Sequence, residues 1–129
     1  MIKRFVDRFV NNKEEIRKCF EEKHPENYVD IVKILLPFLH NEDDEYPIDD
    51  EIVHTIDDGN YQGTLLFVIP EKAYQPHFYY YVKVFYGSCS GCDTFEGIRG
   101  YSDEKPTKEQ VDDYMVLALH IIQGLKEMD

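Results

Sequence analysis

Two apolar runs in the middle of the chain constrain its fold more than any other feature. In residues 64–69 and 78–86, apolar and aromatic side chains occupy odd and even positions alike. This pattern predicts strands that are covered on both faces of a sheet. The short connection of residues 71–77 favours an antiparallel pair. Since a two-stranded sheet is rarely stable alone, residues 52–56 and 97–101 are candidates for a third strand.

Helical patterns lie on both sides of these strands. Residues 2–22 and 26–39 place apolar side chains at helical spacing, and Pro37 should help to end the second helix. Residues 107–110, Thr-Lys-Glu-Gln, form a capping-box pattern that opens a terminal helix. We therefore predict an α+β fold in which a small antiparallel sheet of two to four strands packs with N-terminal helices and a C-terminal helix. Because the sequence holds no repeat and no linker, residues 1–129 are expected to form a single domain.

The balance of charge limits which partners suit the chain. Its 129 residues include 26 acidic and 14 basic side chains, which give a formal net charge of -12. Because such a chain repels phosphate backbones, we expect no direct binding of nucleic acid. We expect a basic protein surface as the partner instead, including a surface built to hold nucleic acid. The alternative is that the charge only keeps the protein in solution.

Residues 41–58 concentrate this charge. Nine of the eighteen positions are acidic and none is lysine or arginine. We expect an exposed loop, with a short helical turn near residues 49–55, whose carboxylates occupy a basic surface made for phosphates. The alternatives are a solvated loop and a calcium site, although the residue order of an EF-hand is absent. The predicted partner-binding residues are Glu42, Asp43, Asp44, Glu45, Asp49, Asp50, Glu51, Asp57 and Asp58.

A second candidate site is the loop of residues 87–94, Gly-Ser-Cys-Ser-Gly-Cys-Asp-Thr. Its glycines and small hydroxyl residues allow successive backbone N–H groups to face one concavity, which suits a phosphate or a nucleotide. The lysine of a P-loop is absent, and a structural turn is the alternative. The predicted ligand-binding residues are Gly87, Ser88, Ser90, Gly91, Asp93 and Thr94.

Cys89 and Cys92 in the same loop have the spacing with which two thiolates bind one zinc ion. A structural zinc site needs further ligands, and the chain holds no second cysteine pair. We therefore expect no cofactor and keep zinc as the alternative. Redox catalysis would need an activated thiolate in a different context of strands and helices. The interpretation that we favour is a tight loop in which small cysteine side chains pack.

The strand predicted over residues 78–86 is rich in aromatic side chains. Tyr79, Tyr81 and Phe85 share one of its faces, and we expect these rings to belong to the core. An exposed tyrosine face would instead serve a partner or a homo-oligomer. Stacking of nucleic-acid bases would need flanking cations, of which this strand supplies only Lys83.

The chain resembles neither an exported protein nor a membrane protein. Charged residues run through its N-terminus, its apolar stretches are short, and its three cysteines do not indicate a disulfide framework. We expect a cytoplasmic protein with no membrane partner. Because no catalytic motif is present, we predict a non-enzymatic binding protein. The alternatives are a small-ligand module, a zinc protein and an enzyme of another type.

Three segments resemble parts of small uncharacterised proteins from bacteriophages and low-GC Gram-positive bacteria. They are residues 59–66, residues 86–94 with the sequence Tyr-Gly-Ser-Cys-Ser-Gly-Cys-Asp-Thr, and residues 109–120, so the resemblance covers roughly the second half of the chain. It implies a phage setting, the cytoplasm of a host cell, and an inhibitor of a host defence or nucleic-acid-handling complex. It implies no catalytic residues.

Overall fold

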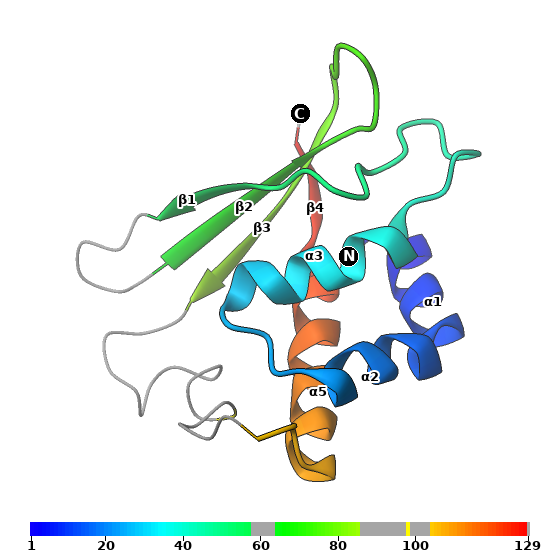
Figure 1. Ribbon diagram of the computed structural model, residues 1–129. Coiled ribbons are helices and arrows are strands. Elements are labelled where there is room, and N and C mark those ends of the chain that lie inside the picture. The colour runs from blue at the N-terminus through cyan, green and yellow to red at the C-terminus, as the bar shows by residue number, and fades with distance from the viewer. Residues whose placement is uncertain (58–63, 86–97, 99–103, 129) are drawn as a thin grey trace.

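The structure is a computed structural model that describes residues 1–57, 64–85, 98 and 104–128 (Figure 1). In this part of the chain, four helices accompany a four-stranded antiparallel sheet, which confirms the α+β class and the small sheet. The elements are α1 (Lys3–Asn11), α2 (Lys13–Glu22), α3 (Tyr28–Leu39), β1 (His54–Asp57), β2 (Thr64–Pro70), β3 (Tyr79–Phe85), α5 (Lys108–Gly124) and β4 (Lys126–Met128).

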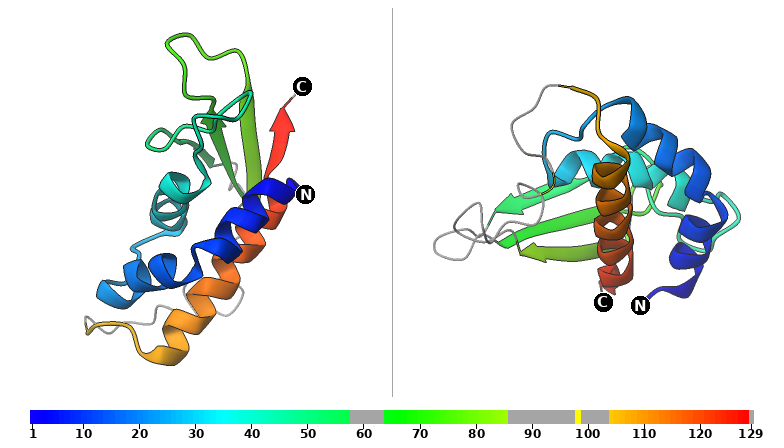
Figure 2. Two further views of the ribbon diagram at one scale, coloured as in Figure 1. Left: turned by 90° about the vertical axis from the view of Figure 1, so that its right-hand side faces the viewer. Right: turned by 90° about the horizontal axis from the view of Figure 1, so that it is seen from below.

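The strands follow one another across the sheet in the order β1-β2-β3-β4. The antiparallel pairing of β2 with β3 is confirmed, and β1 supplies the third strand within one or two residues of the first candidate segment. Of the second candidate, residues 97 and 99–101 lie outside the described residues. Sequence reasoning missed β4, because its Lys-Glu-Met sequence has no strand pattern of its own. It becomes a strand because α5 delivers it to the edge of β3 (Figure 2).

Among the described residues only one face of the sheet is fully buried, so the prediction of cover on both faces is wrong for this part of the chain. Along β3, Tyr80, Val82 and Val84 are buried, whereas Tyr79 and Tyr81 are only partly buried. The reason is that the described helices lie together on one side of the strands (Figures 1 and 2). The other face keeps its apolar side chains without a helix over it in the described part of the chain.

The first predicted helix, residues 2–22, is wrong as one continuous element. The chain turns at Asn12 (φ -116°, ψ 20°), where the side-chain amide donates to the carbonyl oxygen of Arg8 at 2.8 Å. Helices α1 and α2 therefore run in different directions (Figure 1). Both helices still direct their apolar residues into the core, where Phe5, Phe9, Ile16 and Phe20 are all buried.

The two other predicted helices are confirmed. Helix α3 begins after Asn27, whose side chain accepts a hydrogen bond from the backbone of Asp30, and it ends soon after Pro37. Helix α5 begins with the complete capping box, in which Thr107 and Gln110 each accept from the backbone of the other. The inner face of the sheet and the helices share one apolar core, to which β2 contributes Phe67 and Ile69 and α5 contributes a full-length apolar face.

Candidate partner-binding surface

The segment between α3 and β1, residues 41–53, is called the acidic strap below. The prediction of an exposed loop is wrong for its middle part, since Ile48 is fully buried and Asp49 is 7% exposed. The predicted helical turn near residues 49–55 is also absent from this described segment, which leads directly into β1. Backbone hydrogen bonds from Asp49 to Pro70 and from Lys72 to Pro47 fasten the strap to the end of β2 and to the connection that follows it.

Asp44 fastens the strap to helix α1. Both of its carboxylate oxygens accept hydrogen bonds from the Arg8 guanidinium, at 2.6 and 2.7 Å, and Arg4 approaches one of them to 3.7 Å. The Asp44 side chain is only 13% exposed. These hydrogen bonds, together with the positive charge of Arg8, lower the pKa of Asp44. Asp44 thus serves to shape the strap.

Asp49 and Asp50 shape the strap as well. One carboxylate oxygen of Asp49 accepts from the backbone N–H groups of Glu51 and Ile52, both at 2.7 Å, which stabilises a tight turn. Asp50 forms a salt bridge of 2.6 Å with Lys72, and this hydrogen bond lowers the pKa of Asp50. Three of the predicted partner-binding carboxylates therefore already have partners within the chain.

The remaining described carboxylates of the strap are the ones available to a partner. They are Glu42, Asp43, Glu45 and Glu51, whose side chains are exposed. Among the residues that the structure describes, none of them forms a salt bridge. Asp58 lies outside the described residues, and so does the side chain of Asp57.

A cleft of about 410 Å³ opens beside the strap. One wall is aromatic, because the rings of Tyr46 and Phe78 stack with centroids 4.4 Å apart and planes 8° from parallel. The hydroxyl of Tyr80 accepts from Arg4 at 2.8 Å and donates to the carbonyl oxygen of Tyr46, which holds this wall in place. The cleft is lined by Arg4, Asp43, Asp44, Glu45, Tyr46, Phe78 and Glu127.

Carboxylates beside an aromatic stack suit an arginine side chain. Its guanidinium pairs with the carboxylates while the flat face of that group lies on a ring. Sequence reasoning named Asp43, Asp44 and Glu45 but missed the aromatic wall. The available signal was Tyr46, the one aromatic residue among the acidic residues of segment 41–58. Its stacking partner Phe78 is 32 residues away in the sequence, and only the fold brings the two rings together.

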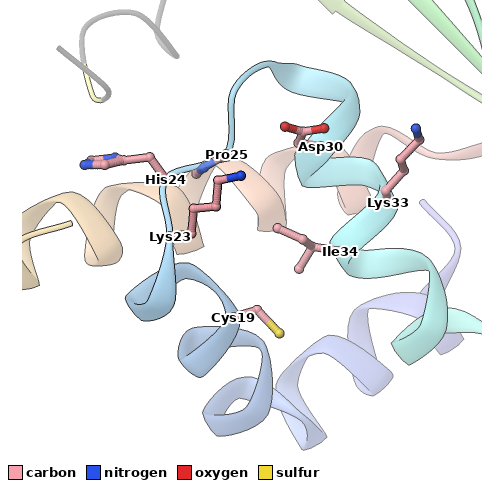
Figure 3. Close-up of a pocket in the computed structure, with 7 residues that line it drawn as sticks. All are labelled: Cys19, Lys23, His24, Pro25, Asp30, Lys33 and Ile34. Carbon is pink, nitrogen blue, oxygen red and sulfur yellow. The ribbon is translucent and has the colours of Figure 1, made fainter. Parts of the chain in front are cut away.

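A second cavity, of about 360 Å³, lies between α2 and α3 (Figure 3). Lys23 and Lys33 line it together with the carboxylate of Asp30, so its charge is mixed. Cys19 lines it too, but burial and the nearby Glu22 raise the pKa of this thiol, which disfavours the reactive thiolate. His24 is buried, with its Nδ1 atom 2.6 Å from the Tyr114 hydroxyl. These contacts indicate that Cys19 and His24 have structural roles at this cavity.

The loop of residues 87–94 lies outside the described residues, and with it all of the predicted ligand-binding positions, Cys89 and Cys92. In the part of the chain that is described, no cluster of three or more histidine, cysteine or acidic side chains is placed to hold a metal ion. The same residues contain no helix with the length and apolar character needed to cross a membrane. The zinc site and the anion site stay predictions.

Comparison with known proteins returned no matching family model, no matching curated protein and no matching solved structure.

Proposed function

We propose that this protein is a non-enzymatic acidic binding protein, and that its strap engages a basic surface of another protein. The observation that carries the proposal is that some strap carboxylates form bonds within the chain, whereas others are exposed to solvent. Asp44, Asp49 and Asp50 are used inside the chain, and they hold the backbone that presents Glu42, Asp43, Glu45 and Glu51 to solvent without a salt bridge among the described residues.

Preorganisation explains why such a strap suits binding. A single exposed ion pair contributes little, since water and salt screen it. Several carboxylates on an ordered backbone contribute more to the binding free energy, because no further conformational entropy is lost to order that backbone when the partner binds. The attraction steers the encounter and weakens as the salt concentration rises.

The cleft supports a specific anchor at one end of this surface. An arginine side chain of the partner would rest on the Tyr46 ring and pair with Asp43 or Glu45. Arginine and aromatic anchors in pockets carry much of the binding energy of protein interfaces. The partner surface is therefore expected to be rich in arginine.

The partner class that we propose is a nucleic-acid-handling or host-defence protein, whose basic surface the strap would occupy as an inhibitor. The density of carboxylates in a segment that itself contains no lysine or arginine supports this class, because such a surface competes with phosphates for the same lysine and arginine side chains. A phage and its host are the setting that the sequence resemblance of residues 59–66, 86–94 and 109–120 implies, and the setting is part of the proposal.

The test is a displacement assay. Basic proteins of a Gram-positive host are loaded with a short fluorescent duplex, and release of the duplex by the protein is followed by fluorescence anisotropy. We expect release by the wild type and none by the variant Glu42→Lys, Asp43→Lys, Glu45→Lys, Glu51→Lys. The matched control changes the exposed carboxylates Glu14, Glu22, Glu109 and Asp113 to lysine.

The control variant has the same net charge as the strap variant, so it separates the strap from the charge of the whole molecule. Retained release by the control supports the strap as the binding surface. Equal loss in both variants would show that only net charge acts, and the proposal would then be wrong. Circular dichroism of both variants checks that each one is folded.

A further inference from the structure

The outer face of the sheet, opposite the core, carries positive charge. The strand register places His54, Val68, Tyr81 and Lys126 in one row across the sheet, since each is the direct neighbour of the next. Lys83 lies on the same face, two residues along β3 from Tyr81. His54, Lys83 and Lys126 are exposed.

Neither lysine of this face is neutralised by a residue that the structure describes. Among the described residues, Lys83 and Lys126 form no salt bridge, and no acidic residue has a side chain described on this face. Glu127, the acidic residue of β4, pairs with Tyr80 and so belongs to the opposite face, where it approaches Arg4. The formal charge of -12 therefore conceals a face whose described charges are all positive.

Aromatic rings stand between these cations. Tyr81 is directly opposite Lys126 on the neighbouring strand, and side chains in such a pair have Cβ atoms about 5 Å apart. Tyr79 lies two residues before Tyr81 on the same face, so about 6.8 Å separates them along the strand. Both tyrosines are partly exposed. That separation is about twice the stacking distance of roughly 3.4 Å within a duplex strand.

We propose that the outer face of the sheet binds single-stranded nucleic acid. Two bases, splayed apart from each other, stack on Tyr79 and Tyr81, and the phosphates that flank them pair with Lys83 and Lys126. Single strands suit such a face because their bases are free to leave one another and meet an aromatic ring. A duplex does not suit it, because its bases are already stacked and paired.

The charge of the whole chain does not prevent this binding. At physiological salt the Debye length is about 8 Å, so carboxylates farther away than that are largely screened from a phosphate on the sheet. A second copy is a poorer occupant of the face, because a symmetric face-to-face contact would bring the lysines of the two copies together. The binding surface proposed for the strap involves other residues, so the two proposals stand independently.

The test measures fluorescence anisotropy of a labelled oligothymidylate at increasing potassium chloride concentrations. With two phosphates neutralised, the logarithm of the binding constant should fall with the logarithm of salt concentration with a slope of about -1.4, because each contact in a single strand contributes about -0.7. The variant Lys83→Glu, Lys126→Glu should lose binding. Its matched control is Lys18→Glu, Lys105→Glu, two exposed lysines elsewhere, which should bind nearly as the wild type does.

The aromatic contribution has its own variant. Tyr81→Leu keeps an apolar side chain on the sheet but removes the ring, and it should weaken binding about tenfold, within the range of one base–aromatic stack. Tyr74→Leu is the control, because Tyr74 is 99% exposed in the connection between β2 and β3. The variant Lys83→Glu, Lys126→Glu should still release duplex in the displacement assay, since its strap is intact.

Three results would overturn the proposal. The first is no binding of the oligothymidylate at low salt by the folded wild type. The second is equal affinity for a duplex of the same length, since stacking on Tyr79 and Tyr81 requires unpaired bases. The third is a dimer in sedimentation velocity that the variant Lys83→Glu, Lys126→Glu dissociates, because the outer face would then belong to a second copy.

Discussion

The Arg8 guanidinium and the Asp44 carboxylate form two hydrogen bonds, of 2.6 and 2.7 Å, that join helix α1 to the strap across 36 positions of sequence. A third hydrogen bond of Arg8, to the carbonyl oxygen of Leu39, ties the end of α3 to the same point. An arginine near the N-terminus therefore helps to shape the most acidic segment of the chain.

Replacement of Asp44 by Asn should lower the free energy of unfolding by about 2 kcal/mol at neutral pH, because it removes the charge from largely buried hydrogen bonds. Urea unfolding followed by circular dichroism measures this. The matched control is Asp50→Asn, whose partner Lys72 is exposed, and its effect should be clearly smaller. An equal effect of the two substitutions would contradict the role given to the Arg8–Asp44 pair.

The stability that Asp44 supplies should depend on pH in a defined direction. Its pKa is lowered in the folded state by the hydrogen bond from Arg8, so the stabilisation is fully present above the unfolded pKa of about 3.9. It is lost as the pH falls through the lower, folded pKa. The difference in stability between wild type and Asp44→Asn should therefore shrink below about pH 4. A constant difference at all pH values would contradict this.

The Tyr80 hydroxyl joins α1 to the strap from inside the core, since it accepts from Arg4 and donates to Tyr46. Tyr80→Phe should cost about 1–2 kcal/mol of unfolding free energy at pH 7, because both partners lose a hydrogen bond. The control Tyr79→Phe should cost less, since the Tyr79 hydroxyl makes only a 3.5 Å contact with Pro76. Urea denaturation of the wild type, Tyr80→Phe and Tyr79→Phe measures the three free energies of unfolding.

Burial raises the pKa of Tyr80, so the stability of the wild type relative to Tyr80→Phe should change at alkaline pH. Below the unfolded pKa of about 10, both states keep the phenol proton and the advantage of the wild type is complete. Above it the unfolded state loses its proton first, so the advantage falls as the pH rises through the folded pKa. The stabilities of wild type and Tyr80→Phe should converge above about pH 10.

Thr107→Ala should lower the free energy of unfolding by about 1 kcal/mol, because it removes one half of the capping box that begins α5. Lys105→Ala, an exposed change two residues earlier, should stay within about 0.5 kcal/mol of the wild type. Equal stability of all three proteins in urea would show that the cap contributes nothing to α5.

Gly124 lies where α5 meets β3, and a Cβ atom added there would stand 3.1 Å from Cγ2 of Val82. Gly124→Ala should therefore cost about 1 kcal/mol through overpacking. In a double-mutant cycle, Val82→Ala should recover part of this cost, because it removes the methyl group that the new atom meets. Strict additivity of the two changes would rule out the clash.

Local patterns in the chain identified much of the fold. Apolar spacing and caps located α3 and α5, and the aromatic run located β3. They failed where the outcome depends on distant residues. The apolar spacing does not separate α1 from α2 at Asn12, because their apolar residues keep one helical spacing throughout. The partly exposed Tyr79 and Tyr81 of β3 were assigned to the core because the sequence of a strand does not say which of its faces meets the helices.

The candidate surfaces divide in the same way. Composition alone determined that residues 41–58 form the acidic centre of the chain, because nine of these positions are acidic and none is lysine or arginine. The tertiary structure decided which carboxylates are used internally, because Arg8 and Lys72 reach the strap only after folding. It also decided that Lys83 and Lys126 share one face, since strand pairing places Lys126 opposite Tyr81, 45 residues away, and net charge carries no information about where charges meet.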